Sequence, residues 1–231
     1  MKTILITGAE SGLGHELVKV FSKNGWHVLA TCRAKKDFPQ ESLSDNISVL
    51  SLDVADQESL ESIAENLKDK SIDVLINCAG VYDAKTNSVD GNTVISTNPE
   101  ITRVFQINSV APKLLADMLV QNLKKGAEKL VVTISSGMGT YSEMDEYHAE
   151  HWPYSASKAA VNYAMIAFTK QHPDIKSVLV NPGWMKTKIG GKDAPLEPSF
   201  SAQKIFELIS EHDKKLRNGK LIDYQGKVMD L

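Results

Sequence analysis

ILITGAESGLGHELVKVF, residues 4–21, is the stretch that decides the fold. A short apolar run ends in a turn with three glycines, Gly8, Gly12 and Gly14, and the turn leads directly into apolar residues at helical spacing. Glycines allow a tight turn, and the first turn of the helix presents N–H groups and partial positive charge to a pyrophosphate. The stretch therefore predicts a strand, a phosphate-binding turn and a helix, although its spacing is GxxxGxG rather than GxGxxG. A glycine turn that serves only strand-to-helix packing is the alternative.

Further apolar runs rich in β-branched residues follow the first, and all are continuous rather than alternating. They cover residues 28–30, 49–52, 74–76, 130–134, 178–180 and, more weakly, 221–222. Continuous runs are typical of strands buried on both faces of a parallel sheet. Segments with helical spacing separate them: 13–21, 60–67, a long one at 104–123, 159–167 and 205–209. The alternation predicts an α/β fold, a single-domain doubly wound parallel sheet of about seven strands with helices on both faces, over residues 1–231.

Composition and charge exclude several classes of protein. A net charge of −3 gives no indication of a nucleic-acid partner. Two cysteines, Cys32 and Cys78, are too few for a disulfide framework and lack metal-site spacing, so we expect reduced thiols and a cytoplasmic protein. The first apolar run is too short for a signal peptide and no stretch has the length of a membrane span, so no membrane partner is expected.

The end of the second apolar run carries a basic residue where NAD-selective sites place an acid. Arg33 stands there, with Lys35 and Lys36 close by. A guanidinium can bind a 2′-phosphate through two parallel hydrogen bonds, so this position predicts that NADP(H) is preferred over NAD(H). A solvated surface arginine is the alternative.

YSASK, residues 154–158, opens the most apolar helical segment. Tyr154 and Lys158 are four residues apart and therefore share a helix face. A nearby ammonium favours the phenolate and lowers the tyrosine pKa, so the pair predicts a tyrosine that passes a proton to a carbonyl oxygen. A chance tyrosine and lysine at helical spacing is the alternative.

Seven motifs together resemble the short-chain dehydrogenase/reductase family. They are TGAESGLG (7–14), LDV (52–54), NCAG (77–80), INS (107–109), ISS (134–136), YSASK (154–158) and NPGWMKT (181–187). The resemblance runs from residue 3 to about 187 and implies a Rossmann-like fold, with motifs gathered at the carboxyl ends of the strands.

The resemblance implies four catalytic residues. Asn108 would support a proton-relay water, Ser136 would steady the substrate carbonyl, Tyr154 would be the general acid–base, and Lys158 would bind the nicotinamide ribose. It also implies a set of cofactor-binding residues: Gly8, Ser11, Gly12, Leu13, Gly14, Arg33, Asp53, Val54, Asn77, Ala79, Gly80, Tyr154, Lys158, Pro182, Gly183 and Thr187. Asp53 as a helix cap, Asn108 as a former of a helix kink and Ser136 as a plain strand-end serine are the alternatives.

Three positions depart from the family pattern. Cys78 replaces the second asparagine of the NNAG motif, and Ser11 stands where many NADP-preferring members carry a basic residue. The gap from Ser136 to Tyr154 is longer than usual, which makes Ser135 a rival to Ser136. Residues 141–152, the insertion, contain His148 and His151, but no further ligands suggest a metal, so none is expected. The insertion is predicted to wall the substrate pocket or to cover the face through which family members dimerise.

The Gly- and Pro-rich residues 183–199 are predicted to be a substrate-side loop, with Trp184 and Met185 as an apolar wall. The loop resembles the branch that contains C-factor and Sniffer-type carbonyl reductases. The resemblance implies an NADP-dependent carbonyl reductase acting on a small-molecule carbonyl or alcohol, or alternatively a dinucleotide-binding regulatory protein with little turnover. A homodimer or homotetramer through helices near 103–124 and 154–170 is the family default, and the insertion leaves a monomer open. The epimerase/dehydratase branch is disfavoured, because few residues follow Thr187.

Overall fold

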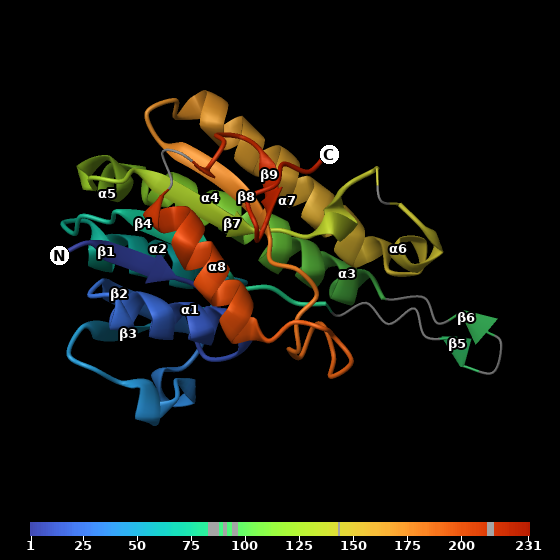
Figure 1. The fold of residues 1–231 in the computed structure, drawn as a ribbon, viewed down its shortest axis with the longest axis horizontal. Helices are drawn as coiled ribbons and strands as arrows, with labels where there is room; N and C mark the ends of the chain where they lie inside the picture. The colour runs from blue at the N-terminus through green and yellow to red at the C-terminus, as the bar shows by residue number, and fades with distance from the viewer. Residues whose placement is uncertain (83–87, 90–91, 94–96, 143, 212–214) are drawn as a thin grey trace.

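The computed structural model describes residues 1–82, 88–89, 92–93, 97–142, 144–211 and 215–231. Its centre is a seven-stranded sheet with the order β3-β2-β1-β4-β7-β8-β9, in which every pairing is parallel (Figure 1). The strands are β1 (Thr3–Ile6), β2 (His27–Cys32), β3 (Ile47–Ser51), β4 (Val74–Asn77), β7 (Leu130–Ile134), β8 (Lys176–Asn181) and β9 (Leu221–Asp223). All seven runs predicted to be strands are confirmed, and so is the doubly wound parallel sheet.

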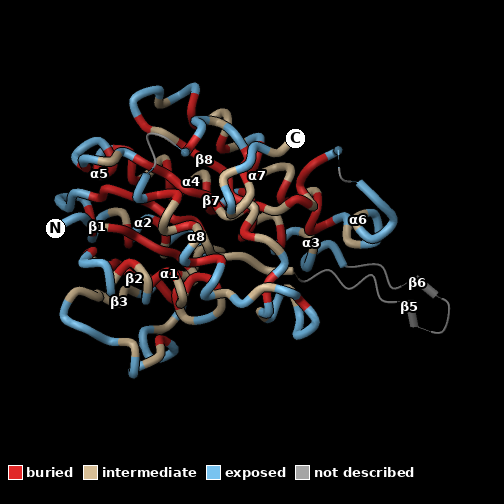
Figure 2. Tube along the Cα trace, in the orientation of Figure 1, coloured by how far each residue is buried: buried red, intermediate tan, exposed pale blue. Residues whose placement is uncertain are grey.

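Helices cover both faces of the sheet. On one face lie α1 (Gly12–Lys23) and α8 (Pro198–Ser210); on the other lie α2 (Gln57–Leu67), α4 (Ala111–Met118), α5 (Val120–Lys125) and α7 (Trp152–Gln171). Each face has its own apolar core, because successive strand residues point to opposite sides: Ile4 and Ile6 join the α1 side, and Leu5 joins the α7 side. The sheet is buried along most of its length (Figure 2), which explains the continuous apolar runs.

Shorter elements connect these layers. They are the 3₁₀ turns η1 (Lys35–Asp37), η2 (Gln40–Ser42) and η4 (Gly137–Gly139), the short helix α6 (Glu146–Glu150), and an antiparallel pair, β5 (Ser88–Val89) and β6 (Asn92–Thr93). Within the described ranges, no helix combines the length and apolar character needed to cross a lipid bilayer.

The long helix predicted at 104–123 is wrong in its continuity. The structure divides it into α3 (Asn98–Phe105), a π-helical turn η3 (Gln106–Val110), α4 and α5. Pro112 explains the change at η3, because proline has no N–H to donate and its ring crowds the carbonyl four residues earlier, that of Asn108. A second break falls at Leu119, whose φ and ψ are −96° and 9°.

The direction of winding reverses between β1 and β4, which are neighbours in the sheet. Ligands of such sheets bind outside the carboxyl ends of the strands at this reversal. The turn after β1 and the NCAG segment after β4 therefore meet at the expected place.

Candidate active site

The glycine turn is shaped first by contacts within the chain. A Cβ on Gly8, whose φ is +67°, would lie 2.8 Å from Cα of Ala79, and one on Gly14 would lie 2.1 Å from the carbonyl oxygen of Gly8. These two glycines are required for packing whatever the turn binds. A Cβ on Gly12 would instead lie 3.4 Å from Thr187 Cγ2, so this glycine lies close against the loop after β8.

The two residues beside Gly12 differ in their exposure. Ser11 precedes α1 as an exposed N-cap residue whose side chain makes no capping hydrogen bond. The Leu13 side chain is buried in the core on the α1 side, so only its backbone faces the turn.

Thr7 joins the glycine turn to the NCAG segment. Its Oγ1 accepts hydrogen bonds from the backbone N–H groups of Cys78 and Ala79, both at 3.0 Å. The Asn77 side chain points into the protein, where its Nδ2 donates to the carbonyl of Pro112 at 3.2 Å and to Thr133 Oγ1 at 3.3 Å. Asn77 thus holds β4 against β7 and α4, while Ala79 packs against Gly8 and Gly80 lies beside Asn108.

The residues predicted to bind the adenosine end lie after β2 and β3. Asp53 Oδ1 accepts a hydrogen bond from the N–H of Ala55 at 2.9 Å. The N-cap of α2 is Asp56, which accepts from the N–H of Ser59, so Asp53 is not the cap of this helix. Val54 packs partly against the α7-side core. Arg33 is exposed directly after β2, and within the described residues no partner is found for its guanidinium.

Glu10 carries a feature that no sequence motif singles out. Its Oε2 is buried and has no hydrogen-bond partner among the described residues. The Glu10 carboxylate contributes to raising the pKa of both the Cys32 and the Cys78 thiols, which places it near the ends of β2 and β4. An unsatisfied carboxylate oxygen beside a helix N-terminus fits a ligand that brings hydroxyl donors and phosphates, such as a dinucleotide.

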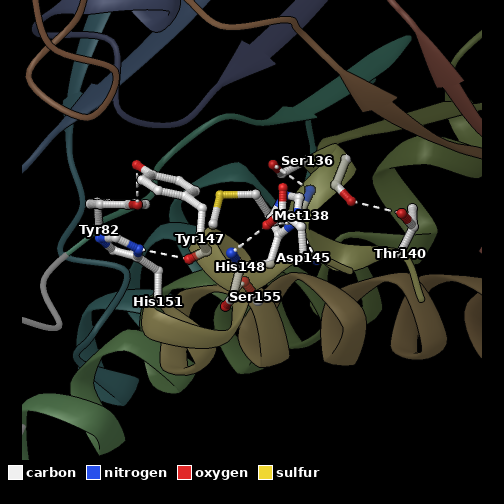
Figure 3. A network of polar contacts seen from close by, with 10 residues as sticks. Tyr82, Ser136, Met138, Thr140, Asp145, Tyr147, His148, His151 and Ser155 are labelled. Carbon is white, nitrogen blue, oxygen red and sulfur yellow. Dashed lines mark hydrogen bonds and ion pairs between the residues drawn. The ribbon is translucent and has the colours of Figure 1, made fainter. Parts of the chain in front are cut away.

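The two rival serines after β7 have different surroundings. Ser135 Oγ is buried and donates to Asn162 Oδ1 at 2.5 Å. Ser136 is half-buried, and its Oγ accepts from the N–H of Met138 at 3.1 Å (Figure 3). Its hydroxyl also lies near enough to Tyr154 to lower the pKa of the phenol. The geometry therefore favours Ser136 as the serine that faces the tyrosine.

Tyr154 and Lys158 lie one helical turn apart on α7 and are both buried, with exposed fractions of 8% and 5%. Lys158 Nζ donates to the carbonyl of Ile134 at 2.9 Å and lies 5.6 Å from the centre of the Tyr154 ring. Burial raises the pKa of Tyr154 to about 12, against the opposing hydrogen bond of Ser136. The direction is opposite to the depression predicted from the sequence, because burial outweighs every favourable contact of the phenolate.

Burial also disfavours the charged form of Lys158 and so shifts its pKa. It lowers the pKa of Lys158 to about 8, while the charge of a Cys78 thiolate opposes the change. Burial likewise raises the pKa of the Cys78 thiol to about 12, so the thiol is neutral at physiological pH. Lys158 is therefore the positive charge of the site below a pH of about 8.

Asn108 lies in the π-helical turn, and its side chain hydrogen-bonds to the backbone just after the NCAG segment. Its Oδ1 accepts from the N–H of Val81 and its Nδ2 donates to the carbonyl of Val81, both at 2.9 Å; the same Nδ2 donates to Ser157 Oγ at 3.0 Å. The amide therefore ties α7 to the backbone beside Gly80, and π-helical turns of this kind are frequent at functional sites.

The two histidines of the insertion have structural partners. His148 forms a capping box with Asp145 at the start of α6, and His151 donates from Nδ1 to the carbonyl of Tyr147 at 2.9 Å. Residue 143 lies outside the described part of the insertion. Over the residues that the structure describes, no group of three or more metal-ligating side chains is found.

Trp184 and Met185, the two residues of the loop after β8 that were predicted to form an apolar wall, differ in their exposure. Trp184 is 59% exposed and its Nε1 donates to the carbonyl of Gly190 at 2.7 Å. Met185 is buried in the α1-side core, so it does not line a pocket and that prediction is wrong. Gly183 has a φ of +81° and turns the chain against Leu196, and the carbonyl of Pro182 accepts from Ser201 Oγ at 2.8 Å.

Comparisons with known proteins agree with this geometry. The family model described as short chain dehydrogenase matches residues 2–197. The chain is 30% identical to C-signal of Myxococcus xanthus, over 72% of this chain and 97% of that protein. Carbonyl reductase Sniffer of D. melanogaster superposes with a TM-score of 0.86 at 28% identity, with all of both chains covered. NADPH-bound carbonyl reductase from chicken fatty liver superposes with a TM-score of 0.83 at 27% identity, over 100% of this chain and 99% of that one.

Proposed function

The chain belongs to the short-chain dehydrogenase/reductase family of oxidoreductases, and from this premise we propose that it transfers a hydride between NADP(H) and a small carbonyl or alcohol substrate, with Tyr154 as general acid–base. One observation carries the proposal. The side chain of Tyr154 lies near enough to Ser136 for that serine to lower its pKa, and it lies one helical turn from Lys158. The backbone carbonyl of Tyr154 is joined through Ser157 to Asn108. Separate segments of the chain, far apart in the sequence, supply these groups.

Each group has a task that follows from its surroundings. Ser136 is half-buried beside Tyr154, so a substrate carbonyl oxygen would accept hydrogen bonds from both hydroxyls. Tyr154, with a pKa of about 12, carries its proton at neutral pH and can donate it to that oxygen. Bound nicotinamide would supply or accept the hydride.

The residues that would hold the cofactor extend from the glycine turn to Lys158. They are the N-terminus of α1 after β1, the Ala79–Gly80 backbone after β4, Asp53 after β3, and Thr187, which lies against Gly12 in the loop after β8. Arg33, exposed and directly after β2, is the group that would bind a 2′-phosphate. NADPH is bound in the carbonyl reductase from chicken fatty liver, and this supports the same cofactor here.

The test uses purified protein, NADPH and a panel of aldehydes, ketones and diketones. We expect Tyr154→Phe to lower kcat by about 10²- to 10⁴-fold, since the proton donor is removed, and to change NADPH affinity far less than kcat in a fluorescence titration. Tyr163→Phe, on the exposed side of the same helix, is the matched control and should behave as the wild type. Undiminished turnover by Tyr154→Phe would disprove the assignment.

A regulatory role is the second candidate, because the relative at 30% identity is named C-signal. In that case the chain binds a dinucleotide and turns over no compound of the panel. The same titration and panel separate the two, since binding and turnover are measured independently.

A further inference from the structure

Tyr82, Tyr147 and His151 form an aromatic cluster (Figure 3), and the ring of Tyr82 packs against that of Tyr154. The ring of Tyr82 is 4.7 Å from the ring of Tyr154 and tilted by 60°, and on its other side it stacks on His151 at 5.3 Å and 28°. Tyr147 closes the cluster, with its ring 4.3 Å from that of His151. Tyr82 therefore lies between the tyrosine of the site and the insertion.

Tyr82 is held at both its ends. Its hydroxyl shares a hydrogen bond of 3.0 Å with the hydroxyl of Tyr147. Its backbone neighbour Val81 is gripped at both N–H and carbonyl by the amide of Asn108. The insertion thus fixes the Tyr82 hydroxyl, and the π-helical turn fixes the backbone beside Tyr82. The Tyr82 ring therefore cannot easily move away from the ring of Tyr154.

The insertion itself is anchored at the start of α7. Ser155 Oγ donates to the carbonyl of His148 at 3.3 Å, and the N–H of Ser155 donates to the carbonyl of His151 at 3.1 Å. Tyr147 is 55% exposed, so one end of the cluster faces solvent while the other covers a phenol that is 8% exposed.

We propose that Tyr82 is a positioning residue: its ring, fixed by Tyr147 and by the grip of Asn108 on Val81, holds the Tyr154 phenol in place and keeps water away from it. The proposal rests on the proposed function of Tyr154. Aromatic pairs prefer tilted arrangements at such distances, and a ring held on one side restricts the rotation of its neighbour. Burial is the largest cause of the raised pKa of both tyrosines, which agrees with a cover that excludes water. The other titratable groups around the phenol are Lys158 on α7, His151 of the insertion, and Cys78, which faces Lys158 from the end of β4.

The first experiment removes the ring. In Tyr82→Ala we expect kcat to fall by tenfold or more, with NADPH affinity unchanged within about twofold, because the acid is misplaced while the cofactor site is intact. Tyr82→Phe keeps the ring and should restore kcat to within about two- to tenfold of the wild type, the loss expected for one hydrogen bond. Tyr141→Ala, an exposed tyrosine of the same insertion, is the matched control. A Tyr82→Ala protein with wild-type kcat overturns the proposal.

The second experiment needs no turnover and so separates this proposal from the proposed function. With tyrosines ¹³C-labelled at Cζ, the Tyr154 resonance is assigned by its loss in Tyr154→Phe and followed to a pH of about 10.5, just above the usual tyrosine pKa. We expect the phenol to stay protonated in the wild type and to be largely ionised in Tyr82→Ala, since water reaches it. Equal ionisation in both proteins overturns the proposal even if every substrate fails.

A double-mutant cycle covers the case in which Tyr82→Ala does not fold. Tyr82→Phe and Tyr147→Phe each remove the same hydrogen bond, so we expect equal effects on kcat and no further loss in the double variant. Additive losses would mean that the two hydroxyls act separately, and the proposed fixing of the ring by Tyr147 would be wrong.

Discussion

Lys158 is a buried ammonium whose charge the isolated chain compensates only in part. Its pKa is about 8 when folded, against 10.5 for a lysine side chain in water, so it binds fewer protons in the folded state between these values. The free energy of unfolding therefore rises with pH through that window, and below pH 8 the buried charge lowers it by the full amount, on the order of 3 kcal/mol at most. The site thus keeps a destabilising charge for its function.

Replacing that charge should stabilise the protein without cofactor. We expect Lys158→Met to raise the free energy of unfolding at neutral pH by about 1–3 kcal/mol, partly offset by the lost hydrogen bond to Ile134, and the advantage to shrink between about pH 8 and 10.5. Urea unfolding across this range measures it, with the exposed Lys170→Met on the same helix as control. An advantage that does not change with pH would contradict the assigned cause.

Arg33 allows a test of cofactor preference at the same scale. Arg33→Ala should weaken NADPH binding by about 10- to 100-fold, the loss expected when a charge-assisted hydrogen bond to a phosphate is removed. NADH affinity should stay the same, because its ribose carries no 2′-phosphate. Titrations of both nucleotides provide the ratio, and Lys36→Ala is the control for net charge. If Arg33→Ala weakened the binding of NADPH and NADH equally, Arg33 would not be the residue that sets the preference for NADPH.

Some residues of the candidate site could be predicted from the sequence, and others could not. The pairing of Tyr154 with Lys158 follows from a spacing of four on a helix, which is a local rule. Glu10 and Tyr82 were missed, because an unsatisfied oxygen or a ring contact depends on residues distant in the chain. The predicted direction of the Tyr154 pKa shift was wrong for the same reason, because the burial of its side chain depends on the whole fold.

At the scale of elements, each strand of the seven-stranded sheet could be predicted, because a strand buried on both faces is apolar at every position. The short strands β5 and β6 were not predicted. The segment 104–123 shows the limit. Apolar spacing predicts one helix, but Pro112 and the turn at Leu119 break it, and the resulting π-helical turn carries Asn108. The proline was visible in the sequence, while the outcome, a widened turn rather than a kink, was not.

The junction of β1 and α1 leads to a prediction about Gly14. A Cβ there would lie 2.1 Å from the carbonyl oxygen of Gly8, and a backbone atom cannot move aside cheaply. We expect Gly14→Ala to lower the free energy of unfolding by about 1–3 kcal/mol and to weaken dinucleotide binding. Gly25→Ala, where nothing lies within 4 Å but φ is +77°, should cost only about 1 kcal/mol and leave binding intact. A Gly14→Ala protein as stable as the Gly25→Ala control would contradict the close approach.

At the scale of the whole molecule, the outer face of α4, α5 and α7 is the surface that we expect to meet a second copy of the chain. A shallow hollow of about 550 Å³ lies there, lined by Lys113, Asp117, Val120, Gln121, Gln171 and His172. Tyr163, on α7, is 80% exposed. An aromatic side chain so exposed is typical of an interface residue.

Tyr163→Glu tests this face. We expect the wild type to be a dimer or tetramer by light scattering and Tyr163→Glu to be a monomer at the same concentration, because a carboxylate cannot be buried unpaired. Tyr141→Glu, equally exposed but on the insertion, should not change the mass. A wild type that is already monomeric would disprove this face as an interface between copies of the chain.

The last residues of the chain are hydrogen-bonded to the insertion. The N–H of Met229 donates to the carbonyl of Leu221 at 2.9 Å, and Ser142 Oγ donates to the carbonyl of Asp230 at 3.2 Å. The N-terminus lies at the far end of the molecule (Figure 1). A purification tag or a fluorescent fusion at the C-terminus would therefore stand beside Ser142 of the insertion, whereas the same attachment at the N-terminus would lie far from it, and kinetic constants from the two kinds of preparation should not be pooled.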